Sequence, residues 1–158
     1  MGAGILPITI YKGIILVLLA RERNKEIWSD FGGIRENNET EFETAIREGY
    51  EESNGILGTP KQLRNDVRKN LITSITSNNY TSFIYKINYD ENLPIYFKNF
   101  NIFAETYLKE KLAKKGLFEK DEIKWFKLSD LQKPPYFKLL RYHYKGIIKH
   151  FSLYLKNK

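Results

Sequence analysis

Side chains that could take part in catalysis or metal binding are most densely grouped in residues 32–57, GGIRENNETEFETAIREGYEESNGIL. The protein has a net charge of +7 and 19 acidic residues, yet seven of these fall in this one stretch: Glu36, Glu39, Glu41, Glu43, Glu48, Glu51 and Glu52. On an α-helix, positions three and four apart share a face. The last three acids therefore form one carboxylate cluster, with Arg47 beside it.

Two interpretations of this cluster are open. Three carboxylates at this spacing repel one another, and a divalent cation would relieve the repulsion. Oxygen ligands without His or Cys favour Mg²⁺ or Mn²⁺ over zinc, and Mg²⁺ is usually shared with substrate phosphates. The cluster therefore indicates phosphate chemistry. A solvated acidic helix face explains the same charges, and the cluster alone does not decide between the two.

The spacing of the cluster gives a second signal. Its residues fall at fixed intervals: Gly33, then five residues, Glu39, then seven, Arg47 and Glu48, then two, Glu51 and Glu52. This pattern resembles the Nudix box, G-x5-E-x7-R-E-U-x-E-E-x-G-U, in which U is a bulky aliphatic residue. WSDFGG (28–33) and EIKWFKLSDL (122–131) are also similar to segments of Nudix proteins. The resemblance covers about residues 5–131.

The resemblance implies an α/β/α sandwich that hydrolyses a nucleoside diphosphate linked to another group. By similarity, six residues have implied roles: metal ligation by Glu51, Glu52, Glu48 and the Gly32 carbonyl, orientation of the carboxylates by Arg47, and contact with the metal's outer shell by Glu39. Glu48 would bind the metal or activate water. The cofactor, Mg²⁺ or Mn²⁺, would neutralise the pyrophosphate and lower the pKa of a bound water.

The sequence departs from the box at two points. Gly49 stands where the box has a bulky aliphatic residue, which removes a packing group and costs a helix about 1 kcal/mol. The box places its closing glycine at position 54, which is Asn54 here, and the glycine comes one residue later, at Gly55. We therefore expect the helix to end near Ser53, with Asn54 or Gly55 at positive φ. Neither departure affects a carboxylate.

The resemblance implies that the general base lies outside the box, since in many Nudix enzymes it comes from a later loop. Glu119 and Glu122 both precede a late strand. Glu122 is predicted to be the catalytic base because it lies nearer the matching position, although a solvated acid or a lysine partner explains it equally well. His143 and His150 lie outside the resemblance, and surface or packing roles are predicted for both.

The elements that position these residues follow from hydrophobic periodicity and turn residues. Strands are predicted over 3–10, 13–21, 71–77, 81–89 and 123–128; helices over 40–53, 102–115 and about 137–156; and loops over 22–38 and 90–101. Gly116 is expected to stop the second helix. This order predicts α/β layers around a mixed sheet, in a single Nudix-type domain spanning 1–158.

The last segment, 131–158, has no acidic residue and seven basic ones: Lys133, Lys138, Arg141, Lys145, Lys149, Lys156 and Lys158. Since the chain has 26 Lys and Arg residues, 19 remain elsewhere to balance the 19 acids. The predicted helix is therefore basic on one face, with the other face packed on the body. Lys145 and Lys149 on the basic face are predicted to bind RNA. A solubilising lysine surface explains them as well.

Aromatic residues supply further candidates for substrate binding. Trp28 precedes the box, and Phe97 lies with Tyr96 and Phe100 near Lys98. Aromatic rings beside a cation can stack a nucleobase and hold its phosphate. Trp28 and Phe97 are predicted to do so, although filling the core is an alternative role for such residues.

Composition restricts the remaining functions. The chain contains no cysteine, which excludes disulfides and thiolate metal sites. Its longest apolar run, 13–20, is too short to span a bilayer. We therefore expect a soluble, cytoplasmic protein that binds a nucleotide or RNA, without membrane association or sequence-specific DNA binding.

The predicted function is metal-dependent pyrophosphate hydrolysis, with the 5′ cap of RNA as the first candidate substrate. Free nucleotides are the alternative (a dinucleoside polyphosphate, a nucleotide sugar or a dNTP), followed by diphosphoinositol polyphosphates. A non-catalytic nucleotide- or RNA-binding Nudix module is the competing class. The intact Arg47, Glu48, Glu51 and Glu52 argue against it.

Overall fold

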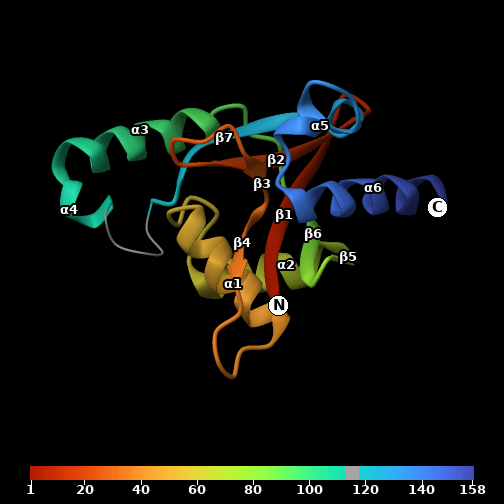
Figure 1. The fold of residues 1–158 in the computed structure, drawn as a ribbon, viewed down its shortest axis with the longest axis horizontal. Coiled ribbons are helices and arrows are strands. Elements are labelled where there is room, and N and C mark those ends of the chain that lie inside the picture. Colours follow the sequence, from red (N-terminus) through yellow and green to blue (C-terminus); the bar gives the residue numbers. More distant parts are fainter. Residues whose placement is uncertain (113–117) are drawn as a thin grey trace.

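The centre of the protein is a mixed β-sheet, shown in the computed structural model of Figure 1. The structure describes residues 1–112 and 118–158. The strands are β1 (Gly2–Tyr11), β2 (Ile14–Glu22), β3 (Trp28–Ser29), β4 (Phe31–Ile34), β5 (Leu71–Ser77), β6 (Tyr80–Lys86) and β7 (Lys120–Lys127). β1 pairs antiparallel with β4 and β2, and parallel with β6. β5 pairs with β6 and β7 with β2, both antiparallel, so the prediction of a mixed sheet is confirmed.

Helices cover both faces of the sheet. They are α1 (Glu41–Glu52), α2 (Pro60–Asn70), α3 (Leu93–Tyr107), α4 (Lys109–Leu112), α5 (Tyr136–Leu139) and α6 (Tyr142–Lys156), with a 3₁₀ turn at Asp130–Gln132. In Figure 1, α1 and α3 lie to the left of β1 and α6 lies to its right. The chain therefore has the predicted α/β/α layers, and among its described helices none is long and apolar enough to cross a membrane.

The two cores follow from the alternation of side chains along the strands. Ile5 of β1 packs on one face with Leu63 of α2 and with residues of α1 and α3. The next residue, Leu6, points to the other face and joins Phe151 of α6. Both β1 side chains are fully buried. A central strand that is apolar on both faces requires a helical layer on each side.

The segment 22–38, predicted as a loop, contains two short strands, so this prediction is wrong. β4 pairs with β1, with Gly32 opposite Gly4 and Gly33 opposite Ala3. A Cβ at Gly32 would lie 2.5 Å from the Gly4 Cα and 1.9 Å from the Tyr80 hydroxyl. The glycines that looked like loop residues are therefore required by the close approach of two backbones and a tyrosine.

Two other boundaries also differ from the prediction. The segment 90–101 is not a loop, because α3 begins at Leu93, with Pro94 in its first turn. The predicted helix over 137–156 is divided: the Arg141 amide donates to the Trp28 carbonyl (2.9 Å), and Leu140 forms a bridge with Trp28. The predicted stop at Gly116 lies outside the described residues. The strands predicted over 3–10, 13–21, 71–77 and 123–128 and the first helix are confirmed, whereas the strand predicted over 81–89 ends at Lys86. The helix predicted over 102–115 falls on the end of α3 and on α4, and α2 was not predicted.

Candidate active site

The acidic cluster is carried by α1, whose two ends are fixed by its own sequence. At the N-terminus, Thr40 and Glu43 form a capping box, in which the Thr40 hydroxyl accepts from the Glu43 amide. At the C-terminus the helix stops at Ser53, and both Asn54 (φ 52°) and Gly55 (φ 74°) are left-handed. The expected helix end is confirmed. The carboxylates of the last turn therefore lie at a well-defined point beside β4.

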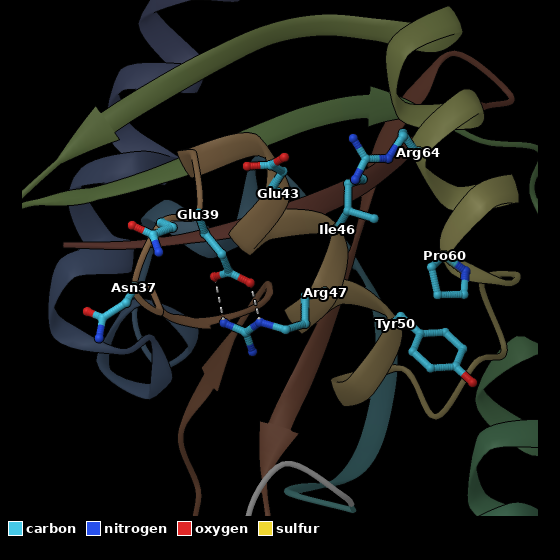
Figure 2. Close-up of a pocket in the computed structure, with 9 residues that line it drawn as sticks. Asn37, Glu39, Glu43, Ile46, Arg47, Tyr50, Pro60 and Arg64 are labelled. Atoms are coloured by element: carbon cyan, nitrogen blue, oxygen red, sulfur yellow. Dashed lines mark hydrogen bonds and ion pairs between the residues drawn. The ribbon is translucent and has the colours of Figure 1, made fainter.

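Arg47 is the hub of the cluster. Its guanidinium contacts Glu39 through two nitrogens, Nε at 2.7 Å and Nη2 at 3.1 Å (Figure 2). Nη1 donates to Glu48 (2.7 Å) and to Glu51 (3.2 Å), and Nη2 also donates to the Ile34 carbonyl (3.0 Å). One cation thus gathers three carboxylates that are eight, one and four residues away in sequence.

Glu52 faces the interior instead. Its side chain is 5% exposed, and Oε2 accepts from the Gly32 amide at 2.7 Å. Oε1 lies 3.4 Å from the Lys120 ammonium, which is itself only 1% exposed. Glu52 is therefore tied to the β3–β4 segment and to the start of β7. The Gly32 backbone lies at the cluster through its amide, which contacts Glu52, and the metal-ligand role of its carbonyl stays a prediction.

Two glycines make room for this arrangement. A Cβ on Gly33 would lie 2.5–2.6 Å from the carboxylate atoms of Glu48, so only glycine lets Glu48 rest against β4. A Cβ on Gly49 would lie 2.5 Å from Cδ1 of Ile5. The core space that the box assigns to an aliphatic residue is therefore filled from β1, and Gly49 does not leave a void.

Electrostatics separates the acids into two groups. Hydrogen bonding to Arg47 lowers the pKa of Glu39 to about 2. Burial raises the pKa of Glu48 and of Glu51, against the opposing effect of Arg47. Burial also raises the pKa of Glu52 to about 8, against the opposing charge of Lys120. Three carboxylates in one helical segment are thus unfavourable as anions in the absence of further positive charge.

The donor set fits a hard divalent cation. Among the described residues, no group of three or more His, Cys, Asp or Glu side chains already has the arrangement of a metal site. Glu48 and Glu51 are instead paired with Arg47, and Glu52 with Lys120. These three carboxylates nevertheless lie in adjoining turns and have only oxygen donors, which Mg²⁺ and Mn²⁺ prefer. A bound cation would replace the contacts that now neutralise them.

The structure does not bring the predicted base, Glu122, to the cluster. Its carboxylate pairs with Arg21 at 3.1 Å, and its partner across the sheet is also Arg21. Glu119, the other acid considered, raises the pKa of both Glu48 and Glu51 through its charge, so it lies within electrostatic range of both. Glu119 also lines a hollow that contains Glu52. Of the two acids, Glu119 is therefore the one that shares a hollow with a carboxylate of the cluster.

That hollow is a polar pocket of about 320 Å³ beside Glu52. Four cations and three acids line it: Arg23, Lys25, Lys120 and Arg141, with Glu22, Glu52 and Glu119. Lys25 and Arg141 each contact Glu22, at 3.2 Å, and remain 63% and 43% exposed. Exposed cations next to a candidate metal site suit a phosphate group. We call this the polar pocket.

A larger hollow, of about 400 Å³, lies on the outer side of α1 (Figure 2). Glu39, Arg47, Tyr50 and Arg64 line it, together with the start of α2 at Pro60. It reaches the outer side of the Glu39–Arg47 pair, but Glu48, Glu51 and Glu52 are not among its lining residues. Size alone therefore does not mark the site, and the polar pocket is the better candidate for substrate phosphates.

The predicted substrate-binding residues fall elsewhere. Trp28 is 5% exposed and packs edge-on against Phe126 at 5.0 Å, and Phe97 is 1% exposed. Neither ring has a free face for a base, so the stacking prediction is wrong for both. Lys145 and Lys149 lie on α6, where both ammonium groups cover the Phe137 ring (5.5 and 5.2 Å). They belong to the layer opposite α1.

Sequence reasoning missed two buried groups. Lys120 is turned inward by a register shift between Arg21 and Glu22, which leaves Asp121 as the extra residue. Asp30 is fully buried and accepts from the Tyr80 hydroxyl and the Ser82 hydroxyl, each at 2.6 Å. Burial raises its pKa to about 6. Asp30 lies within the WSDFGG stretch, and the similarity of that stretch to Nudix proteins was the only sequence feature that could have pointed to it.

Comparisons with known proteins agree with the fold. No protein-family model and no curated protein sequence matches the chain. Solved structures do match: a C. elegans Ap4A hydrolase binary complex has a TM-score of 0.53 at 16% identity, over 99% of this chain and 98% of that one. The NUDIX domain of Shewanella oneidensis NrtR, complexed with ADP ribose, has a TM-score of 0.51 at 14% identity, over 98% and 86%.

A third match is the bifunctional NMN adenylyltransferase/ADP ribose pyrophosphatase from Francisella tularensis, complexed with AMP and a manganese ion. Its TM-score is 0.61 at 16% identity, over 96% of this chain and 40% of that one. With the layers, the sheet and the acidic helix described above, these matches show that the chain has the Nudix hydrolase fold. The predicted fold class is confirmed.

Proposed function

We propose that the protein is a metal-dependent hydrolase that cleaves the phosphoric anhydride of a nucleotide in which a nucleoside diphosphate is linked to another group. One observation carries the proposal: Arg47 gathers Glu39, Glu48 and Glu51 at the end of α1, next to Glu52. This is an oxygen-only donor set on a fold whose solved relatives include an Ap4A hydrolase.

Each group of the site has a chemical role in this proposal. Glu48, Glu51 and Glu52 would hold Mg²⁺ or Mn²⁺, which supplies charge neutralisation and a water of lowered pKa. Arg47 holds the carboxylates in place against their mutual repulsion. Glu119 accepts the proton of the attacking water. The new P–O bond forms as the anhydride P–O bond breaks, with the leaving phosphate neutralised by Arg141.

A free nucleotide is the substrate that the site supports best. The polar pocket, of about 320 Å³, has the size of a site for a small ligand and lies directly beside Glu52. Relatives of this fold were solved with ADP ribose and with AMP and manganese. Dinucleoside polyphosphates and nucleotide sugars share a nucleoside diphosphate with ADP ribose.

RNA with a modified 5′ end is the second candidate, and Arg141 supports it. This residue lines the polar pocket and also starts α6, so it connects the candidate site to the basic segment 131–158. A chain of nucleotides that left the pocket along α6 would meet Lys145 and then Lys149. Diphosphoinositol polyphosphates have no base, and no feature of the site favours them.

The test is turnover of a panel of substrates with Mg²⁺ or Mn²⁺: a dinucleoside tetraphosphate, ADP-ribose, a nucleotide sugar, capped RNA and a diphosphoinositol polyphosphate. We expect hydrolysis of at least one nucleotide, and loss of more than about 99% of it in Glu51→Gln. Glu91→Gln, an exposed acid in the loop before α3, is the matched control and should keep full activity. Binding of nucleotides without any turnover would instead establish a non-catalytic module.

A further inference from the structure

A third, less polar pocket lies where α1 ends. It has a volume of about 220 Å³ and is formed by the turn at Asn54 and Gly55 and by Tyr96, Phe97 and Phe100 of α3. We call it the aromatic pocket. Pockets that enclose a whole drug-sized ligand measure roughly 300–1,000 Å³. The aromatic pocket is smaller, and therefore matches one ring system instead of a complete nucleotide.

Two rings of this pocket have free faces. Tyr96 is 51% exposed and Phe100 is 44% exposed, although both are large and apolar. They are four residues apart on α3, so they lie side by side on one face of the helix. The Phe100 ring is supported from behind by Phe118, with ring centres 5.6 Å apart and planes at 28°. Exposed, supported aromatic rings of this kind stack planar bases.

The pocket also contains an amide that lacks partners. Both Nδ2 and Oδ1 of Asn54 are buried, and neither has a hydrogen-bond partner among the described residues. Burying such a group without a partner is unfavourable. The backbone at this point is fixed, because the Asn54 amide donates to the Glu51 carbonyl (3.1 Å) and the Gly55 amide to the Tyr50 carbonyl (3.0 Å). The unsatisfied donor and acceptor are thus a stable feature of the turn.

The side-by-side donor and acceptor of Asn54 specify what can bind. An asparagine amide pairs with adenine at N6–H and N7, which present a donor and an acceptor. Guanine presents two acceptors, O6 and N7, on the same edge, and satisfies only one of the two groups. For a purine that presents its N7 edge to Asn54, the amide therefore favours adenine.

We propose that the aromatic pocket binds the adenine base of the substrate, with Tyr96 and Phe100 stacked on the ring and Asn54 paired with its edge. This assignment rests on the proposed nucleotide hydrolysis and gives it a base specificity. The geometry is consistent, since Asn54 is only three residues after Glu51, in the turn that directly follows the helix. A base held here leaves its phosphates at the carboxylates of the same helix.

Binding of AMP and GMP to the full chain, measured by calorimetry without metal, tests the base site separately from turnover. The two nucleotides share sugar and phosphate, so any difference reports the base. We expect AMP to bind at least about tenfold more tightly than GMP. Asn54→Gly keeps the left-handed turn and removes the amide. It should lower AMP affinity about tenfold and abolish the preference.

The matched control is Asn78→Gly, since Asn78 is another asparagine at positive φ (50°) but lies exposed in the β5–β6 turn. It should bind AMP as the unaltered protein does. Tyr96→Leu and Phe100→Leu on α3 leave the turn intact and should each weaken AMP binding about tenfold or more. These two variants keep the test valid if the Asn54 variant does not fold.

The outcomes are separable from those of the proposed function. Equal affinities for AMP and GMP, no AMP binding, or a preference that survives both Asn54→Gly and Tyr96→Leu would each overturn the base site. A chain that hydrolyses nucleotide anhydrides without regard to base would keep the proposed function and lose this inference. A chain that prefers AMP through Asn54 but hydrolyses no nucleotide would keep the base site and lose the proposed function.

Discussion

Arg47 shows how one residue can determine the state of a site. Its guanidinium contacts Glu39, Glu48 and Glu51 together, so a single positive charge offsets part of the repulsion among three carboxylates. In the proposed metal site, a divalent ion would have to take over Glu48 and Glu51 from Arg47, and Glu52 from Lys120. Metal affinity is therefore the difference between two sets of ionic contacts, and removing one carboxylate should change it strongly.

The first prediction uses Glu51, whose side chain is 29% exposed. Ligands that bind only the native state stabilise it, by about 2.7 kcal/mol at 100 times the Kd. We expect Mg²⁺ or Mn²⁺ to raise the Tm of the protein, and Glu51→Gln to lose most of that increase. Glu52→Gln is less suitable, because it leaves the buried Lys120 without a charged partner.

Thermal unfolding with and without each metal is the measurement, with Glu91→Gln as the control that should keep the full increase. If Glu51→Gln responds to metal as the unaltered protein does, the cluster is a solvated acidic face.

Gly49 carries the second residue-scale prediction. Alanine is normally favoured over glycine in a helix by about 1 kcal/mol. Here a Cβ would lie 2.5 Å from Ile5, so Gly49→Ala should destabilise the protein by about 1–3 kcal/mol. Ile5→Ala removes the colliding atoms and should itself cost about 2–5 kcal/mol. In the double variant, the methyl group added at Gly49 occupies part of the space that the Ile5 side chain leaves.

The two losses should therefore not add: the double variant should be more stable than their sum predicts, by about 0.5–3 kcal/mol. Urea unfolding of the four proteins gives this coupling energy. Strict additivity would show that Gly49 and Ile5 do not compete for the same space.

Residue-level prediction from sequence was reliable where chemistry depends on spacing along one helix. Arg47 and its neighbouring carboxylates lie together because helical geometry is local. Trp28, Phe97 and Lys120 were misjudged or missed for the opposite reason. Whether a ring is buried, or a lysine turned inward, depends on strand pairing and on a bulge between distant segments. Neither leaves a pattern in the local sequence.

The same distinction holds for whole elements. The strands β5 and β6 and the helix α1 follow from local periodicity and turn residues, and all three were predicted. β4 was not predicted, because two consecutive glycines are typical of a loop in the local sequence. Only the close packing of β1 and Tyr80 against them explains why glycine is needed in this strand. The break before α6 also has a long-range cause, since the Trp28 carbonyl accepts from Arg141. Tertiary contacts, not propensities, decided these boundaries.

Docking of α6 supplies the prediction at this scale. His143, in its first turn, lies against the Tyr80 ring at 4.4 Å, and burial lowers its pKa to about 4. The folded protein therefore prefers neutral His143. The stabilisation from this group is present above the usual histidine pKa, near 6.5, and is lost as the pH falls towards 4. His143→Gln should remove that dependence.

The measurement is the free energy of unfolding in urea from pH 4 to pH 7.5, as a difference between variant and unaltered protein. Taking the difference cancels Asp30 and Glu52, whose raised pKa values give stability the opposite dependence on pH. His150→Gln, on the exposed side of the same helix, is the control and should leave the curve unchanged. A flat difference curve for His143→Gln would contradict the assignment.

On the scale of the whole molecule, the acidic cluster and the C-terminal basic helix lie in opposite layers. The acidic cluster is on α1, whereas Lys145 and Lys149 are on α6, across the sheet (Figure 1). Neither lysine is among the residues that line the polar pocket beside Glu52. RNA can reach them only by leaving the polar pocket past Arg141. The position of the basic helix therefore separates the two substrate classes.

The last prediction uses this separation. Each lysine that neutralises a phosphate releases condensed counterion, so the affinity for single-stranded RNA falls by about 0.7 log units per log unit of salt for each contact. If RNA follows α6, changing both Lys145 and Lys149 to Gln should weaken binding and make the salt dependence shallower by about 1.4 log units. Hydrolysis of a free dinucleotide should be unaffected in the same variant.

The control changes Lys61 and Lys69 of α2, both exposed, to Gln, which removes equal charge from the other layer. If both double variants show the salt dependence of the unaltered protein, Lys145 and Lys149 only keep the surface soluble, and the free nucleotide is the substrate class that remains.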